Sequence, residues 1–364
     1  MECSKRQKLN NHSIDELYNL KIDEPDQNIY KKVINNLDHI AKPINGLGRF
    51  ETLTALIGAI TRTEHIDISK KAVIIMCSDN GIVEEGISQA GQEVTLAVAK
   101  NMSKKRSSVG RMAEMLNVDT IPVDIGINYD GEIPGVLNKK IRMGTRNFKY
   151  EPAMTEEETV KAIFTGIELV SEYKDKGYKI LATGEMGIGN TTTSSAVAAS
   201  LLCCDASIVT GRGAGLTDDK LKHKINIISE AIEKYKLYDE TPINILKTVG
   251  GYDIAGLAGL CIGGALYHLP IVLDGVISMV AALIAERIVP GTVNYLIPSH
   301  KGKEPAVKLL SKQLGLEPVI DGNMALGEGT GAVMMFSLLD IALCIYQDQT
   351  TFSDIGIDEY KRLT

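Results

Sequence analysis

The sequence has no apolar run of the length that a membrane-spanning helix needs, and no apolar segment at its start. Its longest apolar run lies near IAGLAGLCIGGAL and falls short of the roughly 20 residues required. The first residues, MECSKRQKLNNHS, are polar and do not have the apolar centre of a secretory signal. We therefore expect a soluble, cytoplasmic protein that does not insert into a membrane.

Basic tracts, paired cysteines and clustered metal ligands are missing as well. The net charge is −7, and a run as short as KKR at 104–106 gives no surface for a nucleic acid. Six cysteines are scattered without C-x-x-C spacing, several of them in apolar runs, which favours a reducing compartment. His300 has no cluster of cysteine, histidine or carboxylate residues around it, so we expect no metal site and no cofactor.

The chain does contain a regular alternation of short apolar runs with helical patterns, starting near residue 70. Such alternation is typical of right-handed βαβ units. It predicts an α/β fold with a three-layer, Rossmann-like, mostly parallel sheet. The expected strands are 72–79, 120–127, 178–185, 206–211, 270–275 and 293–300, with long helices over 156–177 and 218–237.

The two ends of the chain have a helical pattern instead. We expect residues 1–70 to be a helical segment and residues 71–315 to be the α/β catalytic domain. Residues 316–364 are expected to carry an active-site loop with Glu328 and a second helical segment. The two end segments are predicted to pack together as a smaller helical domain.

Most of the expected strands end in polar or glycine-rich turns, and ligands bind at the carboxyl ends of strands in open α/β sheets. In GEMGIGNTTTSS, Gly187, Gly189 and Asn190 permit a tight strand-to-helix turn, and Thr191 to Thr193 can cap the helix. A helix start of this kind suits a phosphate, although a simple capped turn explains the stretch equally well. The spacing matches neither a P-loop nor a dinucleotide fingerprint, which argues against a Mg²⁺-dependent kinase.

The other turns are ambiguous when taken one at a time. GRGAGLTDDKLKHK has a second turn at Gly211 and Gly213, and Lys224 beyond it is either a solvated lysine or part of a divided nucleotide site. Glu328 lies between two glycines in LGEGTGA, as either a turn residue or a general base with room for a planar substrate. The remaining polar residues after strands are ordinary turn chemistry when considered singly: Asp79, Asn80, Gln92 and Asp274.

Together these stretches resemble the nicotinate-nucleotide–dimethylbenzimidazole phosphoribosyltransferase family of cobamide biosynthesis. The resemblance covers nearly the whole chain after residue 30, through KPINGLGRFE, DNGIVEEGISQAGQEVT, GEMGIGNTTTSSA, GRGAGL, VGGYDIAGLAG, PIVLDG, SHKGKEP and LGEGTGA. It implies transfer of the 5-phosphoribosyl group of nicotinate mononucleotide to a lower-ligand base such as 5,6-dimethylbenzimidazole. The products would be α-ribazole 5′-phosphate and nicotinate, with inversion at the anomeric carbon, and the enzyme would be a homodimer.

The resemblance also implies roles for individual residues. Glu328 is expected to be the general base that takes a proton from the attacking ring nitrogen, and Glu185 to line the same site. The nucleotide phosphate and ribose are expected at Gly187, Gly189, Asn190, Thr191, Gly211, Gly213, Lys224 and Asp274. The pocket for the aromatic base is expected at Asp79, Asn80, Gln92, Met186 and Leu326.

This chemistry explains why carboxylates accompany a phosphate site. The ring nitrogen of nicotinate mononucleotide is cationic, and the transition state carries oxocarbenium-like positive charge that carboxylates stabilise. Two alternatives stay open. Ala90-Gly91 replaces an aromatic-proline pair of many family members, which leaves room for another benzimidazole, a purine or a phenolic base. The second alternative is a partner subunit that binds a nucleotide without catalysis. It is disfavoured because Glu185, Lys224 and Glu328 are all present, and a chain that only binds has no need for a general base.

Overall fold

The fold is built around a parallel sheet. The computed structural model describes residues 12–213, 215–347 and 350–362. Within them, a six-stranded sheet has the order β3-β2-β1-β4-β5-β6, and every pairing is parallel. This order is that of a Rossmann fold, so the predicted fold class is confirmed. The strands are β1 Lys71–Ser78, β2 Asp119–Gly126, β3 Leu137–Asn138, β4 Ile180–Met186, β5 Ile271–Leu273 and β6 Leu296–Pro298, with a separate parallel pair of β7 His300–Gly302 and β8 Ile320–Met324.

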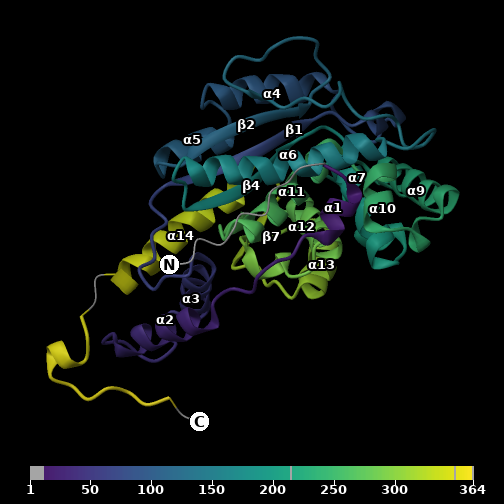
Figure 1. Cartoon of the computed structure of the whole chain (residues 1–364). Coiled ribbons are helices and arrows are strands. Elements are labelled where there is room, and N and C mark those ends of the chain that lie inside the picture. The colour runs from purple at the N-terminus through teal and green to yellow at the C-terminus, as the bar shows by residue number, and fades with distance from the viewer. Residues whose placement is uncertain (1–11, 214, 348–349, 363–364) are drawn as a thin grey trace.

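Helices cover both faces of this sheet, as Figure 1 shows. Their bounds are α1 Ile14–Asn19, α2 Gln27–His39, α3 Arg49–Thr61, α4 Glu93–Ser103, α5 Ser108–Met115, α6 Glu156–Asp175, α7 Asn190–Leu202, α8 Ala206–Val209, α9 Asp218–Tyr235, α10 Pro242–Val249, α11 Tyr252–Leu266, α12 Val276–Ile288, α13 Ala306–Leu314 and α14 Thr330–Gln347. Helices α6, α11 and α12 pack on one face and α4, α5 and α14 on the other. The fold therefore has three layers.

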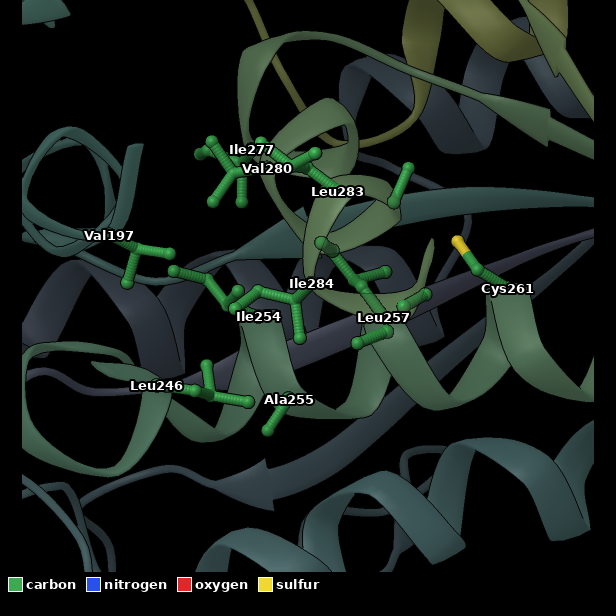
Figure 2. Packing of buried hydrophobic residues seen from close by; sticks show 14 of the residues in the cluster. Val197, Leu246, Ile254, Ala255, Leu257, Cys261, Ile277, Val280, Leu283 and Ile284 are labelled. Atoms are coloured by element: carbon green, nitrogen blue, oxygen red, sulfur yellow. The ribbon is translucent and has the colours of Figure 1, made fainter. Parts of the chain in front are cut away.

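Strand β1 shows how the sequence specifies two buried faces. Ile74 and Met76 join the core cluster that contains α6, α11 and α12, whereas Val73 and Ile75 join the cluster that contains α4, α5 and α14. Successive side chains of a strand point to opposite faces, so a strand covered on both sides is apolar at every position. Figure 2 shows part of the first cluster, where Leu257 of α11 lies close to residues of α12.

Helices α2 and α3 lie near the C-terminal segment at the lower left of Figure 1, whereas α1 lies apart from them, and its Leu17 joins the core cluster of α6, α11 and α12. Helix α2 packs on α3, and the two ends are joined where the Ala41 N–H donates to the Thr350 carbonyl at 2.9 Å. The Asn36 amide donates to the Tyr346 hydroxyl at 3.1 Å. Helix α14 also packs on β4 and β5, and residues 1–11 lie outside the described residues. A separate small domain with the predicted boundaries therefore stays a prediction.

Helix α14 also bears on the expectation of a protein without membrane segments. By length and composition it is apolar enough to cross a membrane, and 56% of it is buried inside the protein. Its inner side chains, such as Val333 and Phe336, belong to the core cluster over the sheet. Packing on the sheet accounts for the apolar character of these side chains.

Two local expectations were wrong. Residues 206–211 form no strand: Asp205 accepts a hydrogen bond from the Ser207 N–H at 2.8 Å and begins the short helix α8. This local cap outweighs the β-propensity of the isoleucine and valine that follow. The threonines after Asn190 also do not cap a helix, because α7 already begins at Asn190 and its N-cap is Gly189, which has φ +93°.

Candidate functional site

A cavity of about 310 Å³ lies at the carboxyl ends of β4 and β5. Its wall is made by the end of β4, the first turn of α7, the turn at Gly213, the start of α12, the arm that β7 and β8 form (residues 300–324) and the turn before α14, with Val98 of α4. These segments are far apart in the sequence and meet because the carboxyl ends of parallel strands lie at the same edge of the sheet. The predicted residues that line the cavity are Glu185, Met186, Gly187, Asn190, Thr191, Gly213, Asp274, Leu326 and Glu328.

Glu185 lies at the end of β4 and is held by Asn190 in the first turn of α7, whose side-chain amide donates to Glu185 Oε2. Burial raises the pKa of Glu185 to about 8, and the negative charges of Asp274, Asp253 and Glu328 act in the same direction, against the Asn190 hydrogen bond. The carboxyl group is therefore largely protonated near neutral pH in the absence of a cation.

Glu328 lies in a turn of unusual backbone conformation. Its φ is +62°, between Gly327 at +80° and Gly329 at +89°. Its Oε2 accepts a hydrogen bond from the Val109 N–H, at the start of α5, at 3.1 Å. Burial and the nearby charge of Asp274 raise the pKa of Glu328, and the Val109 hydrogen bond opposes them. A carboxylate with a raised pKa, held at one oxygen on a cavity wall, can serve as a general base.

Asp274, which follows β5, fixes the turn that carries Glu328. Its Oδ2 accepts from the Gly329 N–H at 3.2 Å, and its Oδ1 accepts from the Gly331 and Ala332 N–H groups at 2.9 and 3.2 Å. These bonds satisfy the first N–H groups of α14, which have no partner within the helix. Burial raises the pKa of Asp274, while His300, whose Nδ1 lies 3.8 Å from Oδ1, opposes the shift.

The predicted phosphate region forms one connected unit next to the cavity. Lys224 is fully buried, and its Nζ donates to Thr191 Oγ1 at 2.9 Å and to the Gly211 carbonyl at 3.2 Å. Burial lowers the pKa of Lys224 to about 8, against the opposing charge of Glu304. No side chain caps α7. The Asn190 and Thr192 N–H groups donate to the Gly187 and Gly189 carbonyls at 3.1 and 2.9 Å, and the positive end of the helix dipole suits an anion. A smaller cavity of about 90 Å³ adjoins here, lined by the 187–191 turn and Gly213.

Three residues predicted for the base pocket, Asp79, Asn80 and Gln92, are not among those that line the cavity. Asn80 is buried, and its side-chain amide donates to the Ile188 carbonyl at 3.4 Å. Asp79 accepts from the Asn128 N–H at 2.8 Å, and Gln92 accepts from the Asn128 side chain at 2.8 Å. The Asn80 contact supports the turn after β4, whereas the other two contacts hold the segment after β2. A direct contact of these residues with a substrate base remains a prediction.

Several lining residues were not predicted to belong to the site: Met324 on β8, Lys303 and Glu304 on the arm, and His300, which the sequence analysis considered only as a metal ligand. Lys303 is exposed and is the lone lysine or arginine among the described lining residues. SHKGKEP was recognised as a stretch that carries the resemblance, but no periodicity shows which of its side chains turn toward a cavity. Within the described ranges, no group of three or more His, Cys, Asp or Glu side chains could hold a metal ion.

Comparison with known proteins agrees with this geometry. A family described as phosphoribosyltransferase matches residues 22–357. Nicotinate-nucleotide–dimethylbenzimidazole phosphoribosyltransferase of Clostridium acetobutylicum is 44% identical over 93% of this chain and 96% of its own length. The protein of that name from Acetivibrio thermocellus is 43% identical over 96% and 97%. The crystal structure of CobT from Thermus thermophilus superimposes with a TM-score of 0.85 at 32% identity, over 91% of this chain and 99% of that one. The chain belongs to the nicotinate-nucleotide–dimethylbenzimidazole phosphoribosyltransferase family.

Proposed function

We propose that the cavity transfers the 5-phosphoribosyl group of nicotinate mononucleotide to an aromatic lower-ligand base, with inversion from β to α at the anomeric carbon. The observation that carries the proposal is the meeting of Glu328, Glu185 and the start of α7, which no side chain caps, around one cavity. Family membership supplies the reaction class, and these groups supply the chemistry that the reaction needs.

Glu328 is the general base of the proposed mechanism. Its carboxylate takes the proton of the attacking ring nitrogen as the new nitrogen–carbon bond forms and the bond to nicotinate breaks. The pair of electrons of the broken bond returns to the pyridine ring, which neutralises its positive charge. Because the departing ring is already cationic, no acid is needed on the leaving side. Attack in line with the departing ring then inverts the anomeric carbon.

Glu185 stabilises positive charge in this proposal. The bound nucleotide brings a pyridinium cation near a carboxyl group whose pKa is raised to about 8, and a nearby cation favours the ionised form. Binding of the nucleotide is therefore expected to release a proton from Glu185. The resulting carboxylate, kept in place by Asn190, then faces the oxocarbenium-like transition state.

The phosphate is assigned to the other end of the site. The first turn of α7, the Gly211–Gly213 turn and Lys224 converge there, and Thr191 joins them through its hydroxyl. A helix amino end and a lysine suit a dianion. Separation of phosphate donors from the carboxylates Glu185 and Glu328 lets one cavity hold opposite charges.

The identity of the base is set by an apolar wall with adaptable side chains. Met186, Leu326 and Met324 line the cavity, and thioether side chains repack around ligands of different shape. We propose that the site accepts bases in addition to dimethylbenzimidazole. The purified protein would be mixed with nicotinate mononucleotide and equal amounts of dimethylbenzimidazole, benzimidazole, adenine and p-cresol, without added metal. More than one ribotide is expected by chromatography, and exclusive use of dimethylbenzimidazole would contradict the proposed breadth. No nicotinate release with any base would contradict the reaction.

We also propose a cytoplasmic homodimer, with the outer side of α14 as its contact. Met334, Ile341 and Ile345 are 39%, 62% and 37% exposed, and their spacing places them on one side of the helix. Sedimentation should give a dimer for the wild type and a monomer for Ile341→Glu. Ile208→Glu, which changes an isoleucine that is 50% exposed on α8, is the matched control and should stay dimeric. A dimeric Ile341→Glu variant would refute this contact.

A further inference from the structure

Glu304 lies on the phosphate side of the cavity, where a carboxylate is unexpected. Its Oε1 accepts a hydrogen bond from the Gly213 N–H at 3.0 Å, in the same turn that was assigned to the phosphate. The side chain is half-buried and lines the cavity beside Thr191 and Gly213. Glu304 lies just after β7 on the arm, 91 positions from Gly213 in the sequence.

The position of this carboxylate resembles that of a bound anion. It takes a backbone N–H of a glycine-rich turn, which is the kind of donor that phosphate oxygens use. A β-carbon on Gly211 would collide with Glu304 Oε2, so the carboxylate lies directly over the turn. Lys224 is close enough for the negative charge of Glu304 to act on its pKa, against the effect of burial.

The charges around the cavity make this arrangement costly for a dianionic ligand. Among the described lining residues the carboxyl groups are Glu185, Asp274, Glu304 and Glu328, and Lys303 is the lone lysine or arginine. Glu185 and Glu328 face the cationic sugar and base in the proposed mechanism, and Asp274 is committed to the start of α14. Glu304 alone lies at the proposed phosphate position, where it and a phosphate would compete for the Gly213 N–H and repel one another.

We propose that Glu304 stands in for the phosphate on the Gly213 N–H and is displaced when a phosphate-bearing ligand binds, so that its charge lowers the affinity of the site. This inference rests on the proposed location of the phosphate. Displacement would free the Gly213 N–H and bring the phosphate close to Lys224 and Thr191, which already bond to one another at 2.9 Å. If Glu304 were a structural clamp that only held the Gly213 turn in place, its removal would have the opposite effect, because the loosened turn would bind phosphate more weakly.

The test is calorimetric titration at pH 7 with nicotinate mononucleotide and, separately, with inorganic phosphate. Glu304→Gln keeps the length and an acceptor for Gly213 but removes the charge, and Glu304→Ala removes both. Asp321→Asn removes an exposed charge from the same arm, on β8, where Asp321 pairs with Lys301, and serves as the control. Unfolding curves of all four proteins would verify that each is folded.

The inference predicts about tenfold tighter binding of both ligands to Glu304→Gln, at least as tight binding to Glu304→Ala, and no change for Asp321→Asn. Weaker binding to Glu304→Ala than to the wild type would overturn it and make Glu304 a structural clamp. Equal binding to wild type and Glu304→Gln would overturn it too. If the wild type binds inorganic phosphate and Glu304→Gln binds it more tightly, but no nicotinate is released in the transfer assay, the proposed reaction fails and this inference stands. Binding of neither ligand to the wild type would refute both.

Discussion

In the turn that carries Glu328, a substitution of Gly327 is predicted to lower activity far more than a matched substitution of Gly315, although both should lower stability by a similar amount. Gly327 has φ +80°, and a β-carbon there would lie 2.5 Å from Glu185 Oε1. Gly315, at the end of α13, has φ +65° and no atom within 4 Å of the same position. At either site, alanine in a left-handed backbone conformation lowers the unfolding free energy by about 1–2 kcal/mol. The contact with Glu185 is specific to position 327.

The close contact with Glu185 should lower kcat/KM more than it lowers the unfolding free energy. Glu185 Oε1 is the end of a side chain, so Gly327→Ala can be accommodated by moving the carboxyl group, at the expense of its bond to Asn190. A displacement of about 1 Å at a reacting centre lowers a rate by about 100-fold. We therefore expect similar loss of stability in Gly327→Ala and Gly315→Ala by urea unfolding, and about 100-fold lower kcat/KM in the first variant alone. Equal kcat/KM values in the two variants would refute this reasoning.

Three further predictions concern titration and charge. The pKa of Glu185 is raised from an ordinary 4.5 to about 8, so its contribution to stability is complete below 4.5 and is lost as the pH rises through 8. Between pH 5 and 9 the unfolding free energy of wild type should fall by up to a few kcal/mol more than that of Glu185→Gln; parallel curves would contradict this. The pKa of Lys224 is lowered to about 8, so affinity for nicotinate mononucleotide, measured by calorimetry, should fall up to about tenfold from pH 8 to 9, and Lys224→Met should lack this step. An unchanged affinity across that interval in wild type would exclude Lys224 from phosphate binding. Leu326→Ala should raise the KM for the base more than the KM for nicotinate mononucleotide, because Leu326 lines the cavity beside Glu328, and equal changes would place Leu326 outside the base pocket.

Much of the fold could be predicted because its causes are local in sequence. Strand β1 is apolar at every position since it is covered on both faces, and the long helix α6 begins with a capping box at Thr155 and Glu158. The segment 206–211 was misassigned because an aspartate cap and a neighbouring helix decide its structure, and neither is apparent in a short apolar run. Propensity is a weak guide where so few residues are involved.

The site was predictable to the extent that its residues follow strands. Glu185, Asp274 and Glu328 were assigned to one site through the family resemblance of the turns that hold them, and they do share one cavity. Glu304 was missed because its role depends on a contact with Gly213 across the fold, and a glutamate before proline looks like an ordinary loop residue. Which side chains support a turn from behind, as Asn80 does, is a property of the packed interior that a linear pattern does not contain.

The most direct test of the central claim compares wild type with Glu328→Gln in a single turnover. Enzyme in excess over nicotinate mononucleotide and dimethylbenzimidazole, without added metal, would be quenched over time and the ribotide isolated for its anomeric configuration by NMR. The account predicts an α-ribotide formed in equal amount to nicotinate, and a rate about 100- to 10,000-fold lower for Glu328→Gln. A β-ribotide, or a variant that matches the wild-type rate, would contradict the assignment of Glu328 as the base for inverting transfer.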